Sequence, residues 1–254
     1  MAGKVKIKRG DVWAVRLKEQ LTAHPEGAAE WMEDHTQILN STVDSLSGLL
    51  RVDDELAYLK LYRFTSLRSK LQYRLGRAQS LRNYRKAVAL GEKGLAVPQQ
   101  LACLAVKQGT LLVVEGFTTG GNLAELWHKR TSESGFDAVM QAAGETLGKL
   151  HAAGYTYGDC RWLNLFWNGQ RVYLTDFNNT RKSRIGSVQQ ARDLARFTAN
   201  SEEFGIGSRL YEQFLGKYLE EVPGTRREVV ERMIRPLYRI RGQHLSDGYG
   251  QRLV

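Results

Sequence analysis

Strand-like patterns of apolar and polar residues mark three segments in the first half of the chain. Residues 56–62 alternate apolar and aromatic residues around one charged position, and residues 37–39 and 48–52 predict a strand pair before them. Because successive side chains on a strand point to opposite faces, these segments predict a small antiparallel sheet. Residues 110–117 are almost continuously apolar, which is typical of a buried strand, and this run reaches Gly116 near its end.

Helical spacing of apolar residues prevails elsewhere. Residues 11–33 predict one or two short helices with a turn at 24–27, and residues 66–90 predict a basic helix. The residues expected to pack in the first region are Trp13, Val15, Leu17 and Leu21. Those expected to pack in the second are Leu67, Leu71, Leu75, Ala78, Leu81 and Ala89. Further helices are predicted at residues 122–128, 136–154, 209–219 and 225–239.

A loop and a hairpin follow the helix that Gly154 is expected to end in a left-handed conformation. Residues 163–167 and 172–174 predict two short strands. Asn168-Gly169 between them favours a two-residue hairpin turn. Such a hairpin brings the residue after its second strand back toward the loop before its first strand.

Three polar residues around this hairpin have the spacing of phosphoryl-transfer enzymes of the protein-kinase-like type. Asp159 precedes Asn164 by five positions, and Asp176 begins an Asp-Phe pair after the hairpin. Transfer of a γ-phosphoryl group needs a carboxylate that faces the acceptor hydroxyl and oxygen ligands for the Mg²⁺ bound to ATP. We therefore expect Asp159 to be the base, and Asn164 and Asp176 to bind Mg²⁺. Each residue alone is a common turn former, so the interpretation depends on all three together.

The chain resembles the bacterial lipopolysaccharide core kinases, which phosphorylate heptose or Kdo sugars of the inner core and share the protein-kinase-like fold. The resemblance extends over residues 56–218. The motifs that carry it are His151-x-x-Gly154, Gly158-Asp159-x-x-x-x-Asn164, Asp176-Phe177 and residues 191–197. It implies an α+β fold of two lobes, with a small antiparallel-sheet N-lobe and a mainly helical C-lobe, and it implies ATP and Mg²⁺ as cofactors.

Two departures from protein kinases bear on the substrate. Gly158 stands where protein kinases usually have the arginine before the catalytic aspartate, and this favours a substrate other than a protein. Asn178 replaces the glycine of the Asp-Phe-Gly element, which reduces backbone freedom after the metal ligand. Related kinases use an aspartate at the position of Asp193 to brace the catalytic loop, and we expect Asp193 to open the next helix in that role.

Lys60 is the residue expected to contact the α- and β-phosphates of ATP, because it lies within the predicted strand 56–62. A lysine that protects a strand edge from aggregation would have the same pattern. Residues 40–47 are rich in hydroxyl groups that can donate to phosphates, although a polar hairpin loop looks the same. Asn83 stands where a glutamate partner of Lys60 is expected. Three alternatives follow from this asparagine. Glu92 or another acidic residue pairs with Lys60 in place of the glutamate, other contacts position Lys60, or the kinase is inactive.

The apolar strand that reaches Gly116 predicts a hinge, where exposed backbone groups meet the adenine edge and two lobes rotate. Glu115 and Phe117 are the expected adenine contacts, and an ordinary strand exit is the alternative. Residues 1–117 are accordingly predicted to form an N-terminal extension and the N-lobe, which covers the nucleotide. Residues 118–254 are predicted to form the helical C-lobe with the catalytic loop.

The chain has 254 residues, and its 37 Lys and Arg against 27 Asp and Glu give a net charge of +10, which favours polyanionic partners. The basic residues are scattered along predicted helices without a nucleic-acid-binding motif, so we expect no nucleic acid. We expect lipopolysaccharide core glycolipid and an anionic inner-membrane surface as partners, with a merely solvated basic face as the alternative. Near the acceptor, Arg181, Lys182 and Arg184 are expected to bind phosphates or carboxylates, unless they are solvated loop charges.

The sequence predicts a cytoplasmic protein, peripheral on the inner face of the inner membrane. It contains no run of about 18 apolar residues, and residues 1–9 lack the apolar core of a secretion signal. Cys103 and Cys160 suit a reducing compartment, and Cys103 is expected in the core. The basic N-terminus and a C-terminal helix are expected to contact anionic lipid. The arginines of that helix are Arg226, Arg227, Arg232, Arg235, Arg239 and Arg241.

These observations predict an ATP-dependent kinase that phosphorylates a heptose or Kdo hydroxyl of the lipopolysaccharide inner core. One alternative is a kinase of another small-molecule or protein hydroxyl, for which an aminoglycoside or choline would require an acidic acceptor pocket. The other is a catalytically silent pseudokinase scaffold, which the asparagine at position 83 and the weak nucleotide loop suggest.

Overall fold

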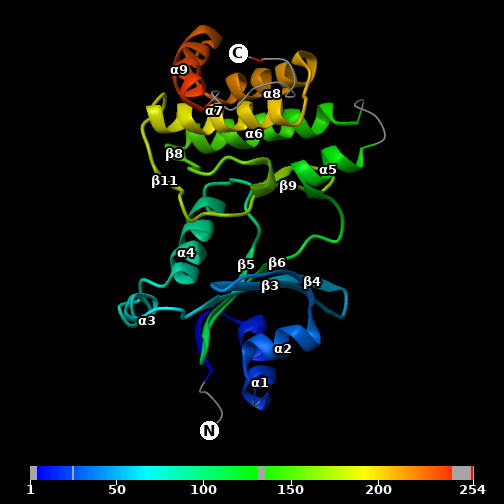
Figure 1. Cartoon of the computed structure of the whole chain (residues 1–254), viewed down its shortest axis with the longest axis vertical. Coiled ribbons are helices and arrows are strands. Elements are labelled where there is room, and N and C mark those ends of the chain that lie inside the picture. The colour runs from blue at the N-terminus through cyan, green and yellow to red at the C-terminus, as the bar shows by residue number, and fades with distance from the viewer. Residues whose placement is uncertain (1–4, 25, 131–134, 242–252, 254) are drawn as a thin grey trace. The chain divides into compact units, whose positions relative to one another are not determined.

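The computed structural model describes residues 5–24, 26–130, 135–241 and 253, apart from the side chains of residues 238–241. The chain divides into two compact units, each described here by itself (Figure 1). The first unit consists of Met1–Gly91 and Pro98–Thr118. The second consists of Glu92–Val97 and Thr119–Val254.

The first unit is built on a six-stranded antiparallel sheet with the order β1-β5-β6-β4-β3-β2. The strands are β1 (Lys6–Gly10), β2 (Gln37–Ser41), β3 (Ser45–Val52), β4 (Glu55–Arg63), β5 (Gln100–Val106) and β6 (Gly109–Glu115). The three strand segments predicted at 37–39, 48–52 and 56–62 correspond to β2, β3 and β4, and the apolar run corresponds to β6. The pattern did not reveal β1 or β5.

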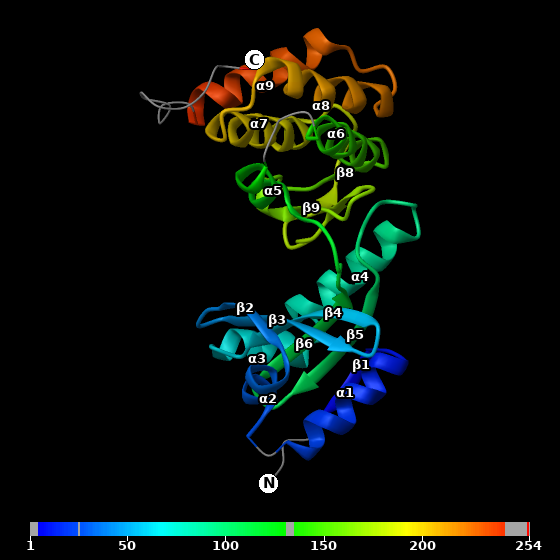
Figure 2. The same ribbon diagram turned by 90° about the vertical axis from the view of Figure 1, so that its right-hand side faces the viewer.

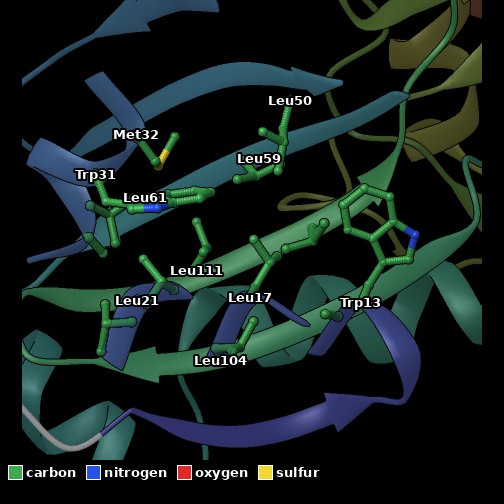
Figure 3. Close-up of a cluster of buried hydrophobic side chains, with 14 of the residues drawn as sticks. Trp13, Leu17, Leu21, Trp31, Met32, Leu50, Leu59, Leu61, Leu104 and Leu111 are labelled. Carbon is green, nitrogen blue, oxygen red and sulfur yellow. The ribbon is translucent and has the colours of Figure 1, made fainter. Parts of the chain in front are cut away.

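The two faces of this sheet are covered by different helices (Figure 2). On β4, Ala57, Leu59 and Leu61 are fully buried against α1 (Val12–Ala23) and α2 (Ala28–His35). The side chains of this core include Trp13, Leu17, Leu21, Trp31, Met32, Leu50, Leu104 and Leu111 (Figure 3). The opposite face carries the alternate residues of β4, and α4 (Gln79–Gly91) packs there through Leu81.

In α1 the buried stripe has the spacing of one helix face, because Trp13, Leu17 and Leu21 recur every four residues. The prediction that Val15 also packs was wrong, since half of its side chain is exposed. Val15 lies two residues from Trp13, which places it on the far side of the helix, and Ala14 is buried instead.

The single helix predicted at residues 66–90 is two helices, α3 (Leu67–Arg74) and α4. Gly76 adopts φ +67° after α3, a left-handed conformation that ends the helix. The prediction that Leu67, Leu71, Leu75 and Ala89 pack was wrong, because all four are exposed. Helical spacing identifies one face of a helix, but it does not show that another element covers that face.

The loop predicted at residues 40–47 is shorter than expected. β2 continues to Ser41 and β3 begins at Ser45, so only three residues connect them. The Thr42 hydroxyl accepts a hydrogen bond from the Ser45 N–H at 3.0 Å, which closes the turn. Ser45 and Ser47 flank the fully buried Leu46, so residues 45–47 belong to β3, and a role of the remaining turn in covering a nucleotide stays a prediction.

The second unit is mainly helical. Its helices are α5 (Leu123–Lys129), α6 (Asp137–Ala152), the 3₁₀ helix η1 (Trp162–Asn164), α7 (Val188–Glu203), α8 (Ser208–Glu221) and α9 (Arg227–Arg241). α6 packs on α8, and α7 packs on α9. A Cβ atom on Gly144 of α6 would lie 2.1 Å from the backbone oxygen of Phe214, so a glycine is needed where α6 and α8 approach.

Short strands lie among these helices, and the loops that contain Asp159 and Asp176 follow two of them. These strands are β7 (Gly121–Asn122), β8 (Tyr155–Thr156), β9 (Leu165–Trp167), β10 (Val172–Leu174) and β11 (Arg181–Lys182). β9 pairs with β10 and β7, and β8 pairs with β11. The hairpin is confirmed, but the two-residue turn was wrong, since Trp167 pairs with Val172. The Asn168 side chain accepts hydrogen bonds from the N–H groups of residues 170 and 171, which stabilises the longer loop. Leu163 belongs to η1, not to a strand.

The segment Glu92–Val97 belongs to the second unit although the chain on both sides of it belongs to the first. The Leu174 N–H of β10 donates to the Ala96 carbonyl oxygen at 3.0 Å, and Leu95 is buried. This segment therefore lies beside the β9–β10 hairpin and is hydrogen-bonded to it.

Over the described parts of the chain, every helix is too short or too polar to cross a membrane. Cys103 and Cys160 are both buried and unbonded to each other, and Cys103 lies in the core as predicted. Residues 1–4 and the side chains of Arg239 and Arg241, which were expected to contact lipid, lie outside the described residues.

Candidate active site

The loop that holds Asp159 begins after β8 and is fastened to α7 by one buried carboxylate. The Asp193 carboxylate accepts hydrogen bonds from the N–H of Tyr157 at 2.6 Å and of Gly158 at 2.7 Å. It also accepts a hydrogen bond from the Thr156 hydroxyl. Asp193 therefore braces the loop as expected, although α7 begins at Val188, so Asp193 lies in its second turn and does not open the helix.

Gly158 is required by the path of this loop. Its φ is +81°, and a Cβ atom there would lie 2.7 Å from the backbone oxygen of Asn179. Both the left-handed backbone and the close approach exclude the arginine that protein kinases place before the catalytic aspartate. The departure noted in the sequence is thus a structural requirement of this chain.

Asp159 is held by two arginines. Arg161 Nε and Nη2 donate to the two oxygens of Asp159, Oδ1 and Oδ2, at 2.9 and 2.8 Å, and Arg196 of α7 also donates to Oδ1. Burial alone would raise the pKa of Asp159, but the hydrogen bonds and charges of Arg161 and Arg196 outweigh it and lower that pKa. The side chain of Asp159 is therefore an oriented anion of which only 16% is exposed.

Asn164 is fixed by the same loop. Its side-chain nitrogen donates to the Asp159 backbone oxygen at 3.0 Å, so the amide oxygen is the atom that can bind a cation. The Tyr157 hydroxyl donates to the Asn164 backbone oxygen at 3.0 Å and accepts from the Asp176 N–H at 3.3 Å. Burial raises the pKa of Tyr157 well above its ordinary value, so the hydroxyl keeps its proton and joins the two segments.

Asp176 follows β10, and its carboxylate is oriented by the turn that it opens. Oδ1 accepts a hydrogen bond from the Asn178 N–H at 2.9 Å, and Oδ2 accepts one from the Asn178 side chain at 3.3 Å. The pKa of Arg161 is raised, mainly by its hydrogen bonds to Asp159, and the negative charge of Asp176 raises it further. The structure thus brings Asp159, Asn164 and Asp176 into one site.

A magnesium ion fits this donor set. The described residues contain no group of three His, Cys, Asp or Glu side chains that could hold a metal by themselves. Mg²⁺ usually binds one or two carboxylates together with substrate phosphates and water, rather than a complete protein cage. The Asp176 carboxylate and the Asn164 amide oxygen are such an incomplete set.

In the first unit, Lys60 shares a pocket of about 340 Å³ with hydroxyl and amide side chains. Its other polar lining residues include Asp44, Ser45, Thr65, Ser69, Gln72, Gln79 and Thr110. Lys60 Nζ lies 5.3 Å from the centre of the Tyr62 ring, and the Asn83 side chain donates to the Tyr62 hydroxyl at 3.2 Å. No carboxylate of the described residues lies within 4.0 Å of Lys60 Nζ.

The two residues expected to contact adenine lie at the end of β6. The Glu115 carboxylate accepts a hydrogen bond from the Gln99 N–H at 3.1 Å, and its own N–H donates to the Gln99 oxygen at 2.8 Å. Phe117 is half-buried. Glu92, the acid named as a substitute partner of Lys60, is exposed in the second unit. The roles of these residues and of Lys60 stay predictions.

A family model described as lipopolysaccharide kinase (Kdo/WaaP) matches residues 34–218. The chain belongs to this family. The resemblance drawn from the sequence motifs is therefore confirmed, and the match begins upstream of residue 56, where the motifs first suggested it.

Among solved structures, this kinase-family chain is similar to one described as WaaP in complex with acyl carrier protein. The two share 17% sequence identity with a TM-score of 0.58, over 91% of this chain and 97% of the other. This likeness confirms the two-lobed α+β fold. A curated protein of Methanocorpusculum labreanum, the probable bifunctional tRNA threonylcarbamoyladenosine biosynthesis protein, is 54% identical over 41 residues. That match spans 16% of this chain and 8% of the relative.

Sequence reasoning missed Tyr157, Arg161 and Arg196 in this family member. Arg196 follows Asp193 by three residues, which places both on one side of α7. Because Asp193 was expected to reach the catalytic loop, this spacing was a usable signal for Arg196. Tyr157 had no such signal, since its hydroxyl joins segments that are 19 residues apart.

We expect the protein to lose stability in acid because His151 is buried. Its nitrogens lie 2.9 Å from the Tyr218 hydroxyl and 3.3 Å from Asp193, and burial lowers its pKa from 6.5 despite the charge of Asp193. Below pH 6.5 the unfolded chain gains a proton that the folded protein resists, so the free energy of unfolding falls as the pH drops. Urea unfolding at about pH 7.5 and pH 5.5 should show this fall.

The change in stability between these two pH values should be smaller in His151→Gln than in the parent protein. The exposed His128 supplies the control, and His128→Gln should keep the parental change. Equal changes in the parent and in His151→Gln would contradict the assignment of a neutral, buried imidazole.

Proposed function

We propose that this protein is an ATP-dependent kinase that phosphorylates a heptose or Kdo hydroxyl of the lipopolysaccharide inner core. The observation that carries the proposal is the state of Asp159, an anion oriented by Arg161 and Arg196 in a loop that also positions Asn164. Family membership supports kinase activity. The proposal includes a cytoplasmic, peripheral location on the inner face of the inner membrane.

In this mechanism, Asp159 is the base. The acceptor oxygen attacks the γ-phosphorus of ATP, its proton passes to Asp159 Oδ2, and the bond between the γ-phosphorus and the leaving oxygen of ADP breaks. Oδ2 is bound by Arg161 alone, whose side chain is half exposed, whereas Oδ1 is bound by both arginines. The acceptor hydroxyl therefore displaces Arg161 from Oδ2, and Arg196 keeps the carboxylate in place through Oδ1.

Magnesium, when bound by Asp176 and Asn164, neutralises charge on the phosphates of ATP. The Asn178 N–H keeps one Asp176 oxygen oriented, and the Asp159 backbone keeps the Asn164 amide oriented. These contacts prepare the two side chains before ATP arrives, so less ordering is needed during the reaction.

Basic residues beside the loop favour an anionic acceptor. β11 pairs directly with β8, so the exposed Arg181 lies opposite Thr156, just before the Asp159 loop. Lys182 and Arg184 are also exposed. Kdo is a carboxylate sugar, and phosphorylated core sugars are anions, so both match this charge. A cationic acceptor such as an aminoglycoside would be repelled.

The direct test is transfer of labelled γ-phosphate from Mg-ATP to purified lipopolysaccharide that lacks core phosphates. Label in core sugars is expected, and parallel acceptors that end at Kdo or carry added heptose would identify the sugar. Lipopolysaccharide that is already fully phosphorylated is the control. Binding of ATP without transfer to any hydroxyl acceptor would favour the silent scaffold.

Lys60→Met is expected to reduce kcat/KM for ATP by about 10–100-fold, since a charge-assisted hydrogen bond contributes roughly 1.5–3 kcal/mol. Initial rates at varied ATP measure this effect. Lys107→Met removes an exposed lysine of the same unit and should leave kcat/KM unchanged. If the two variants behave alike, Lys60 does not bind the phosphates.

The similar WaaP structure contains acyl carrier protein. We include acyl carrier protein among the partners to be tested for this chain, because the similar structure contains it. Co-elution of the two purified proteins at low salt would support this interaction.

A further inference from the structure

The short helix α3 presents its polar side to the protein and its leucines to solvent. Ser69 and Gln72 line the pocket that contains Lys60, and the Tyr73 ring lies 5.3 Å from the Phe64 ring. α3 contains no buried residue. The three leucines of its outer side, Leu67, Leu71 and Leu75, are 84%, 56% and 60% exposed. Helices in proteins are normally stabilised by packing of the apolar side, so an exposed apolar stripe of this kind is a candidate contact surface.

The leucines form one continuous stripe. They recur every four residues, which places successive leucines next to one another along one side of a helix. Arg68 lies on one flank of the stripe, and Lys70 and Arg74 lie on the other, because each residue advances about 100° around the helix. Long basic side chains on both flanks can extend their charges away from the buried apolar stripe.

Every charged residue in the sequence around the stripe is basic. Residues 56–91 contain nine Lys and Arg and no Asp or Glu. Within the described chain, Arg68, Lys70, Arg74 and Arg77 form no ion pair with a carboxylate. This charge is therefore available to an anionic partner.

The helix is already formed in the free protein. Ser66 and Ser69 cap it reciprocally, because each side-chain oxygen accepts a hydrogen bond from the other residue's N–H at 3.2 Å. A partner thus meets the leucine stripe preformed, and binding requires no transition from coil to helix.

We propose that α3 lies on an anionic lipid surface, with Leu67, Leu71 and Leu75 at the acyl-chain boundary and the flanking basic side chains at the head-group phosphates. A lipid surface offers an apolar layer beneath an anionic layer, which matches leucines flanked by cations. A second copy of the chain would bring basic residues against basic residues, which disfavours self-association. This contact is independent of the catalytic roles, so Asp159→Asn should bind vesicles as the parent protein does.

A fluorescent label tests the position of the leucines directly. Cys103 and Cys160 are both fully buried, so Leu71→Cys supplies the one readily accessible thiol of the described residues for a polarity-sensitive dye. Vesicles of phosphatidylglycerol and phosphatidylethanolamine should shift its emission to the blue, whereas phosphatidylcholine vesicles should not. Leu39→Cys carries the label at an exposed apolar residue of β2 in the same unit and should show no shift.

Substitution of the stripe tests its contribution to binding. Leu67→Gln/Leu71→Gln/Leu75→Gln should lower partitioning into the anionic vesicles by about ten-fold or more, because apolar burial contributes to interfacial binding. Its melting temperature should stay near the parental value, since these side chains are exposed. Ile38→Gln/Leu39→Gln removes exposed apolar side chains of β2 as the matched control and should bind as the parent does.

Several outcomes would overturn the proposal. Vesicle binding without a shift of the label at position 71 would place another surface on the lipid. A shift that grows with protein concentration in the absence of vesicles would identify a second copy as the partner. A shift caused by acyl carrier protein but not by vesicles would identify a protein partner instead.

Discussion

Replacing Asp159 with asparagine is expected to lower kcat for phosphoryl transfer by about 10²–10⁴-fold. The amide has nearly the shape of the carboxylate and retains one oxygen for Arg196, but it cannot take the proton of the acceptor hydroxyl. The loop itself should persist, because Asp193 holds it through the N–H groups of Tyr157 and Gly158. Single-turnover transfer to the acceptor, measured at saturating Mg-ATP, gives the rate of the chemical step.

A second carboxylate of the same unit provides the control for this substitution. Asp137 is also bound to an arginine, Arg209, and lies at the start of α6 away from the loop residues that hold Asp159. Asp137→Asn should keep the parental kcat. Binding of ATP should be unchanged in both variants, so that a loss of transfer reports on the base rather than on the nucleotide. An unchanged rate in Asp159→Asn would remove Asp159 from the mechanism.

Replacing Asp193 with alanine is expected to lower the free energy of unfolding of the second unit by roughly 3–5 kcal/mol. Its carboxylate is 2% exposed and accepts hydrogen bonds from Thr156, Tyr157 and Gly158, with His151 beside it. Without it, buried donors lose their partner while the surroundings keep them from water. Activity should fall as well, because the Asp159 loop loses its support.

Urea unfolding followed by tryptophan fluorescence and by circular dichroism would measure this loss. Trp127, Trp162 and Trp167 report on the second unit. Glu220→Ala removes an exposed carboxylate that pairs with Lys217, and such surface pairs contribute at most about 1 kcal/mol. A loss of that small size in Asp193→Ala would show that the loop is held mainly by other contacts.

The fold was predictable where local pattern and tertiary packing agree. In β4, Ala57, Leu59 and Leu61 alternate with two tyrosines and Lys60, and this alternation follows the two faces of the sheet. In α3, the same kind of regularity predicted buried leucines and was wrong. Periodicity depends on the geometry of one element, whereas burial depends on whether another element covers it, and the sequence of α3 contains no information on the second condition.

The candidate site shows the same distinction. The positions of Asp159, Asn164 and Asp176 around one hairpin were predictable because the three residues lie within one short stretch, and their roles stay predictions. Arg196 was missed as an Asp159 partner because its contribution depends on how α7 packs against a loop 37 residues earlier. The conformation of Gly158 likewise depends on Asn179, which approaches it only in the folded chain.

The crossing of the chain at Glu92–Val97 has a consequence for dissecting the protein into fragments. A C-terminal fragment that starts at Thr119 would lack Leu95 and the Ala96 carbonyl, and the Leu174 N–H in β10 would lose its acceptor. A fragment that ends at Thr118 would retain this segment without the hairpin that it binds. Cleavage after Thr118 therefore separates partners, and the fragments are better suited to reassociation than to independent expression.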